Sequence, residues 1–198
     1  MSRLTLLAAA GFAALALAAC GEKTDVATTA EPTATATPNA EASARKAQDF
    51  VNAAGQAGLV EIRTSEMALE KGKNAELKTF AQKMIDDHKA ANDKLKAAAS
   101  AAGLMMPPET LDDFHMRRIN DLVETDGDAD FDADYAALQV DAHKDAIKVF
   151  EDYSKDIDAV SQLKMLADEA LPTLAAHKAE AERVRDVVTK AGAPKNPS

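Results

Sequence analysis

The stretch LKTFAQKMIDDHKAANDKL, residues 77–95, carries apolar residues at the spacing of an α-helix. Spacings of three and four residues place side chains on one face of a helix. His88 lies in the middle of this apolar face, four residues after Met84. The stretch therefore predicts an amphipathic helix that directs a histidine toward the core. The apolar face consists of Leu77, Phe80, Ala81, Met84, Ala91, Leu95 and Ala98.

A weaker copy of the same pattern occurs in the second half of the chain. LKTFAQKMI begins at Leu77 and LKMLADEAL begins at Leu163, with Leu-Lys, an apolar residue and Ala in register. Sparse glycine, proline and aromatic residues, with abundant alanine, favour helix over sheet. Two helical hairpins joined by a longer connection are the layout of a ferritin-like four-helix bundle. We predict this all-α fold, with a short extra helix in the crossover.

Helix start and stop signals give the expected bounds. The proline at position 172 lies inside the last helix and is expected to kink or divide it. The four main helices are expected at about 42–71, 75–102, 132–153 and 160–190, and the short helix at about 110–124.

The first twenty residues, MSRLTLLAAAGFAALALAAC, have the features of an export signal. Arg3 precedes an apolar run that is too short to span a bilayer comfortably. The end of the run, Leu-Ala-Ala-Cys at 17–20, resembles the bacterial lipobox, which implies cleavage before Cys20 and lipidation of that residue. An ordinary signal peptide is the alternative. By resemblance to lipoprotein sorting, Gly21 after the cysteine indicates an outer-membrane lipoprotein whose domain faces the periplasm.

Composition divides the remaining chain and limits its partners. We predict a signal peptide at 1–19, a disordered tether at 20–40, a helical domain at 41–191 and a disordered tail at 192–198. The tether is rich in Thr, Ala and Pro and has almost no large apolar residue. With 33 acidic and 23 basic residues, the formal charge is −10, which disfavours nucleic acid as a partner. We expect the protein to be attached to the membrane through lipidated Cys20. The sequence identifies no protein partner.

Each long predicted helix offers one polar residue on or near its inner face. Three imidazoles and one carboxylate suit a divalent metal such as zinc, iron or copper. The alternative is a buried polar layer in which each histidine is hydrogen-bonded to a neighbouring side chain. The candidate ligands are Glu61, His88, His143 and His177, and the residues expected to support them are Asp87, Gln139 and Tyr153.

Residues on paired helices can meet only if they lie at similar heights along the bundle axis, and the two candidate pairs differ in this respect. Counted from the predicted turns, Glu61 and His88 differ by roughly 5 Å along the axis. His143 and His177 differ by an offset on the order of 9 Å. The first pair is therefore expected to meet more easily than the second.

Several other chemistries do not fit the residue pattern. Di-iron bundles carry Glu-x-x-His on two helices, whereas Ile85 and Leu174 stand three residues before His88 and His177. The acidic run at 125–135 departs from the EF-hand pattern, and a lone cysteine at position 20 excludes disulfide and thiolate-metal chemistry in the domain. No phosphate-binding loop or hydrolase motif occurs, so we predict no catalytic residue, with an oxidoreductase as the weakest hypothesis.

The domain resembles the bacterial domain of unknown function 4142 family over about residues 48–188. The resemblance is carried by the pair Asp87-His88, by Phe131-Asp132 with Tyr135, by Gln139 with His143, and by Leu171-Pro172 with His177. It implies a ferritin-like fold in an exported or outer-membrane protein, and it leaves the activity open.

Two hypotheses for the function follow. In the first, a lipid-anchored envelope protein binds a divalent metal or a small ligand in the bundle core. In the second, a structural or stress-related envelope protein acts through protein partners, and its histidines form a buried polar layer.

Overall fold

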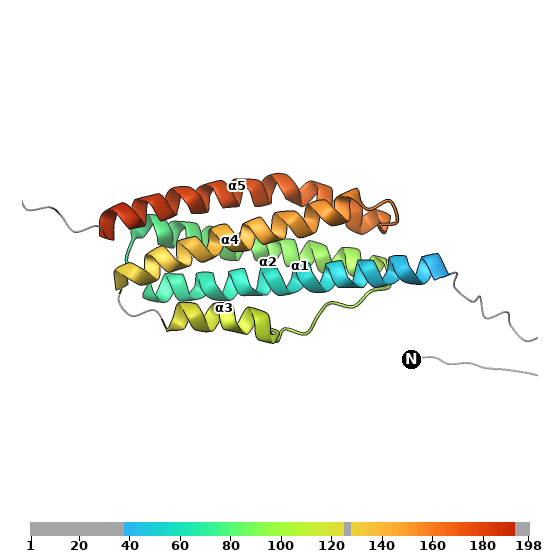
Figure 1. Ribbon diagram of the computed structural model, residues 1–198, viewed down its shortest axis with the longest axis horizontal. Helices are drawn as coiled ribbons and strands as arrows, with labels where there is room; N and C mark the ends of the chain where they lie inside the picture. Colours follow the sequence, from blue (N-terminus) through green and yellow to red (C-terminus); the bar gives the residue numbers. More distant parts are fainter. Residues whose placement is uncertain (1–37, 125–127, 193–198) are drawn as a thin grey trace, which may run out of the picture. The chain divides into compact units, whose positions relative to one another are not determined.

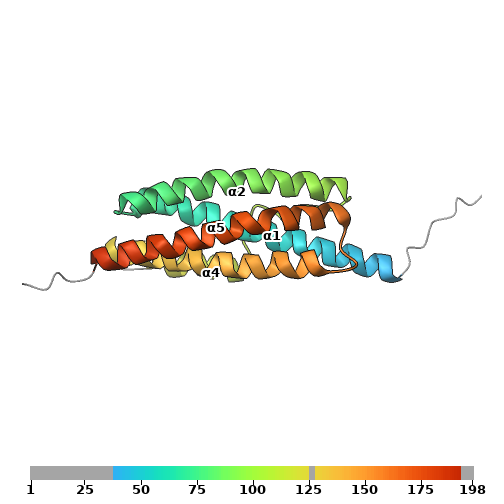
Figure 2. The same cartoon turned by 90° about the horizontal axis from the view of Figure 1, so that it is seen from above.

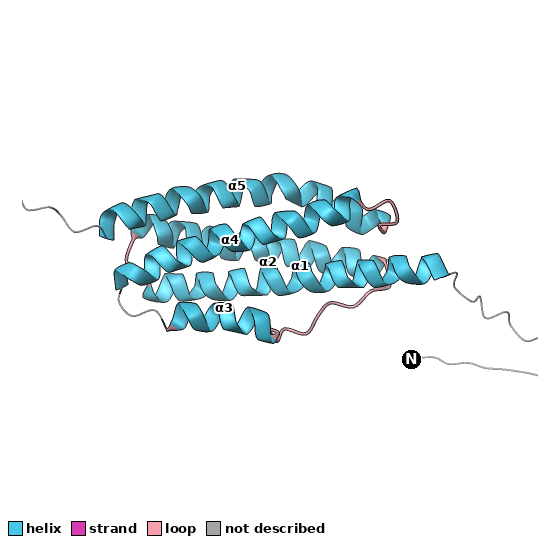
Figure 3. Ribbon diagram, in the orientation of Figure 1, coloured by secondary structure: helices cyan, strands magenta, loops and turns pink. Residues whose placement is uncertain are grey.

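The computed structural model describes residues 38–124 and 128–192, which form five α-helices and contain no strand (Figure 1, Figure 3). The prediction of an all-α fold is confirmed. Cys20, the expected signal peptide and most of the expected tether and tail lie outside the described residues. The helices are α1 (Pro38–Lys71), α2 (Ala75–Ala101), α3 (Asp113–Val123), α4 (Asp128–Lys155) and α5 (Ser161–Gly192).

Four long helices surround a common core, and the short α3 lies outside them. α1 packs against α2 and α4, and α5 packs against α4 and α2 (Figure 1, Figure 2). Each of these neighbouring pairs runs antiparallel, because the crossover through α3 returns the chain along the length of α1 before α4 begins. Within the described ranges, no helix combines the length and apolar character needed to cross a membrane.

The α1–α2 turn is fixed by the first part of α4. The side chain of Asn74 caps α2 by accepting hydrogen bonds from the backbone N–H groups of Glu76 (2.8 Å) and Leu77 (3.2 Å). The buried carboxylate of Asp132 accepts from the backbone N–H of Lys73 at 3.1 Å and of Asn74 at 2.8 Å. This contact sets the height of α4 against α1 and α2.

The crossover is bound to the outer face of α1. Gln56 Nε2 donates to the carbonyl of Thr110 at 3.1 Å, and Arg63 donates to the carbonyl of Glu109 at 2.7 Å. A Cβ atom at Gly55 would lie 2.7 Å from Pro107, so glycine is needed where the crossover touches α1. α3 is therefore held along one side of the long helices.

Two helix bounds differ from expectation for identifiable reasons. α1 begins at Pro38, inside the expected tether, because proline suits the first position of a helix. Pro172 lies inside α5 and does not divide it. This proline is on the exposed side of the helix, where the carbonyl that lacks its partner can bind water.

The apolar core has two parts, and the polar residues lie between them. On α2, for example, Met84 belongs to one part and Leu95 to the other, with His88 between. On α1, Ala68 and Ala54 flank Glu61 in the same way. A buried polar layer therefore crosses the middle of the bundle.

Candidate metal centre

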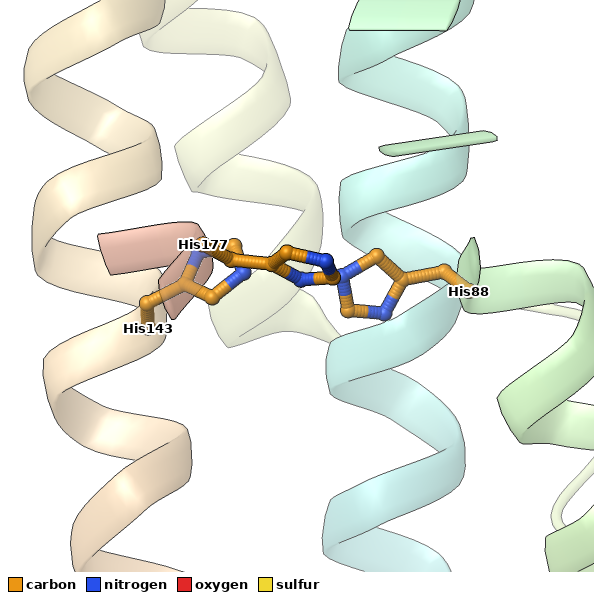
Figure 4. Close-up of side chains that lie close together, drawn as sticks. All are labelled: His88, His143 and His177. Carbon is orange, nitrogen blue, oxygen red and sulfur yellow. The ribbon is translucent and has the colours of Figure 1, made fainter. Parts of the chain in front are cut away.

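Three histidines from three helices meet in this layer. His88 lies on α2, His143 on α4 and His177 on α5, and their imidazoles point toward one another (Figure 4). Their ring centroids are 5.5 Å apart for His88–His143 and His88–His177, and 5.3 Å apart for His143–His177. One ligand nitrogen of each lies within 4.8 Å of the others, and all three side chains are buried. Three potential nitrogen ligands therefore lie together in one layer.

The spacing is close to that of a bound ion. Zn–N bonds of about 2.0–2.1 Å in a tetrahedral site set nitrogen–nitrogen separations of about 3.4 Å. Side-chain rotations that shorten the nitrogen–nitrogen separations by up to about 1.4 Å would bring all three nitrogens to bonding distance. His143 and His177 meet in the structure, although the sequence analysis predicted a larger axial offset between them. The α4–α5 connection centres near residue 158, which reduces the offset to about 6 Å.

The outer nitrogen of each ring has an acceptor. His88 Nδ1 lies 2.9 Å from Glu61 Oε2, and His143 Nδ1 lies 2.8 Å from the backbone carbonyl of Gln139. His177 Nε2 lies 2.8 Å from Asp87 Oδ2. Carboxylate and carbonyl oxygens accept hydrogen bonds, so Nδ1 of His88 and Nδ1 of His143 carry protons. His177 Nε2 faces both the acceptor Asp87 and the ammonium of Lys83, and the tautomer that donates to Asp87 leaves a lone pair on Nδ1.

The inner nitrogens are buried and have no partner among the described residues. They are His88 Nε2, His143 Nε2 and His177 Nδ1. In a neutral imidazole whose other nitrogen is a donor, each of these atoms presents a lone pair. Buried polar atoms are rarely left unpartnered, because the cost is about 1–3 kcal/mol each. Three such lone pairs in one layer could serve as ligands for a divalent transition metal.

Glu61 lies beside this cluster and contacts its outer nitrogens. Besides the contact with His88, its Oε1 lies 3.3 Å from His143 Nδ1, whose proton goes to Gln139. Oε2 of Glu61 orients His88, whereas Oε1 is buried without a hydrogen-bond partner and is a candidate fourth ligand. The metal-binding role of Glu61, as of the three histidines, stays a prediction.

The surroundings shift the pKa values within the cluster. Burial alone would raise the pKa of Glu61, but the three histidines together lower it to about 2. Burial lowers the pKa of His143 despite Glu61, and lowers the pKa of His177 to about 4 despite Asp87. For His88, the charge and hydrogen bond of Glu61 outweigh burial and raise the pKa. His143 and His177 therefore favour the neutral form, whereas His88 holds its proton more firmly than a free imidazole does.

Lys83 is a site neighbour that the sequence analysis did not identify. It forms an ion pair with Asp87 one turn later on α2, and its Nζ lies 3.1 Å from His177 Nε2. Burial would raise the pKa of Asp87, but the hydrogen bonds of Lys83 and His177 lower it. A carboxylate shared by two donors keeps the His177 ring oriented. The only sequence signal for Lys83 is its spacing of four residues from Asp87.

A second group of polar side chains lies next to the histidines, toward the α1–α2 turn. Gln139 Nε2 donates to Thr64 Oγ1 at 3.1 Å, and Thr64 donates to the carbonyl of Val60 at 2.9 Å. The hydroxyls of Ser65 and Tyr135 are 2.8 Å apart. Gln139 thus meets His143 through its backbone carbonyl, while its side chain anchors α4 to α1.

Tyr153, which was expected to support a histidine, and His115, the fourth histidine of the chain, lie away from the cluster. Tyr153 stacks on Phe50 with ring centroids 4.2 Å apart, and its hydroxyl accepts from the backbone N–H of Val160. His115 lies on α3, with Nδ1 2.7 Å from Asp112 Oδ1. Tyr153 is therefore not placed to support a histidine ligand.

Comparison with known proteins identifies the family. A model of a domain of unknown function, number 4142, matches residues 31–184. The chain belongs to the domain of unknown function 4142 family. The match covers Glu61 and the three clustered histidines, so the candidate site lies within the domain that defines the family. No curated protein and no solved structure matches the chain. The family description assigns no activity, and the site must be interpreted from its own chemistry.

Proposed function

We propose that this protein binds one divalent transition metal ion through His88, His143 and His177, at the centre of a ferritin-like four-helix bundle. The proposal rests on the hydrogen-bond partners of the six ring nitrogens. Each outer nitrogen has an acceptor, and each inner nitrogen is buried without a partner. Histidine ligands in metal sites have this arrangement, in which an oxygen orients the ring and leaves the other nitrogen for the ion.

A purely structural polar layer fits these contacts less well. Such a layer is stabilising when its buried atoms are paired with one another. Here the rings contact carboxylates and a carbonyl on their outer sides and present lone pairs to each other on the inner side. Three lone pairs repel or remain unsatisfied unless a cation or a proton lies between them.

The donor set favours a single ion. Imidazole nitrogens suit zinc, copper and iron, and a site of three protein ligands leaves room for a further ligand. Among the buried residues of the described ranges, the carboxylates are Glu61 and Asp132, and Asp132 binds the α1–α2 turn. The site therefore has no pair of bridging carboxylates of the kind that di-iron bundles use.

The cellular setting is proposed from the sequence alone. The lipobox-like end of the first twenty residues supports an exported protein anchored through lipidated Cys20, facing the periplasm from the outer membrane. Mass spectrometry of the native N-terminus tests this part. An acylated Cys20 is expected, and an unmodified Cys20 in native membrane extracts would contradict it.

Metal uptake by the purified protein tests the proposed site. The chelator-treated protein is dialysed against Zn²⁺, and bound zinc is measured for the parent, for a His88→Ala, His177→Ala double variant, and for His115→Ala. His115 lies on α3 outside the cluster and is the matched control. We expect one equivalent in the parent and in His115→Ala, and none in the double variant with its helical circular dichroism intact. No uptake by the parent, or equal uptake by the double variant, would refute the site.

A further inference from the structure

A cavity of about 630 Å³ leads to the candidate centre between α2 and α5. Glu61, His88 and His177 belong to its lining, and so do Lys83 and Asp87. The unpartnered nitrogens of His88 and His177 belong to side chains that line the cavity and that are only 6% and 2% exposed. The volume is within the range of about 300–1,000 Å³ that is usual for small-molecule sites.

The walls of the cavity are mostly apolar and are made by small residues. Alanines from all four long helices contribute, among them Ala54, Ala91, Ala146 and Ala170. Larger side chains at these positions would fill the space between the helices. Phe150 and several leucines complete the walls. An unbranched apolar group of a few carbon atoms fits such surroundings.

The charge of an ion at the histidines favours an anionic head group. The neutral imidazoles add no charge and the carboxylate of Glu61 adds one negative charge, so a divalent ion there keeps a positive charge. Lys83 also lines the cavity, but its charge is paired with that of Asp87, which lines the cavity too, so the metal ion supplies the attraction for an anion. A three-histidine ion keeps an open coordination position. An anionic oxygen entering from the cavity would fill that position.

We propose that the cavity binds a small amphiphilic carboxylate, with its carboxylate on the metal ion and its apolar chain against the alanine-lined walls. This inference rests on the proposed metal site, because the ion supplies the anchor for the carboxylate. The carboxylate donates a lone pair to the open position and displaces water, so no redox step or covalent bond to the protein is involved.

Cobalt-loaded protein separates this inference from the metal site itself. Co²⁺ uptake is followed first by its visible spectrum, and the loaded protein is then titrated with acetate, hexanoate and hexanol. Each buried methylene strengthens binding by roughly fourfold. We expect hexanoate to change the cobalt spectrum at a concentration at least tenfold lower than acetate, and hexanol to leave it unchanged.

Variants in the cavity wall test whether the cavity holds the chain. Ala170→Leu fills the cavity, and Ala175→Leu is the control on the exposed side of the same helix. Ala170→Leu should bind Co²⁺ and acetate like the parent but lose the preference for hexanoate, whereas Ala175→Leu should keep it.

The outcomes are distinct. Failure to take up Co²⁺ would overturn the metal site and this inference with it. Normal Co²⁺ uptake without a response to either carboxylate would overturn the inference and leave the metal site standing. A response to hexanoate that is no stronger than to acetate, or that survives in Ala170→Leu, would show that the cavity does not bind the chain.

Discussion

Glu61 Oε2 lies 2.9 Å from His88 Nδ1, and both side chains are buried in the middle of the helical bundle. The contact joins α1 to α2 at the level where the three histidines meet. It also turns the unpartnered Nε2 of His88 away from Glu61. The pair therefore connects the packing of the bundle to the chemistry of its centre.

Removing the charge of Glu61 should weaken metal binding without abolishing it. Groups that orient a histidine ligand typically contribute 10- to 100-fold to metal affinity. We expect Glu61→Gln to bind Zn²⁺ about 10- to 100-fold more weakly than the parent in a competition titration. Glu66→Gln, at an exposed position on the same helix, should stay within twofold of the parent. Unchanged affinity in Glu61→Gln would contradict the orienting role.

Metal binding near pH 7 should release protons mainly from His88. Glu61 raises the pKa of His88, whereas burial lowers the pKa values of His143 and His177, which are already neutral. Calorimetric titration with Zn²⁺ in two buffers of different ionisation enthalpy measures the release. Glu61→Gln should release fewer protons, because its His88 loses the carboxylate. Equal release in the two proteins would count against this assignment.

The metal-free protein should lose stability as the pH falls from about 6.5 to 4. The pKa of His177 is about 4 when folded against 6.5 when unfolded, so only the unfolded chain binds a proton in this window. Glu61, with a pKa of about 2 against 4.5, extends the loss to lower pH. The raised pKa of His88 opposes this trend, because it favours the folded state below pH 6.5.

The contribution of His177 can be isolated by comparing variants. In urea unfolding of the metal-free protein, His177→Gln should lose less free energy of unfolding between pH 6.5 and 4 than the parent. His115→Gln, outside the cluster, should follow the parent. A pH dependence in His177→Gln equal to that of the parent would show that His177 titrates normally.

Asp132 should contribute to stability but not to metal binding. Its carboxylate accepts from two backbone N–H groups of the α1–α2 turn. Asp132→Ala should lower the free energy of unfolding by about 1–2 kcal/mol and leave the affinity for Zn²⁺ unchanged. Asp141→Ala, at an exposed position of α4, should change neither. A large loss of Zn²⁺ affinity in Asp132→Ala would mean that the turn and the centre are coupled.

The sequence predicted the helices and the inner faces because both depend on local spacing. His88 and His177 stand on apolar stripes, and Glu61 and His143 occupy comparable positions on their helices. The structure brings these four residues together at one level. Their convergence also depends on the lengths of the turns, and the sequence-based estimate of the α4–α5 turn placed His143 and His177 too far apart.

The contacts between helices could not be predicted from the sequence. Asp87 on α2 reaches His177 on α5, and the side-chain rotamers decide which ring nitrogen faces inward. Tyr153 was expected to support a histidine, but its ring stacks on Phe50 in the apolar part of the core. Lys83 gave only the signal of a helical ion pair, which is common on exposed helix surfaces.

The most direct test of the metal centre is anomalous X-ray diffraction at the zinc edge from crystals of the zinc-loaded protein. The account predicts one anomalous peak at about 2.0–2.1 Å from His88 Nε2, His143 Nε2 and His177 Nδ1. A peak at another position, or none at the three histidines, would contradict the assignment of these residues as a metal centre.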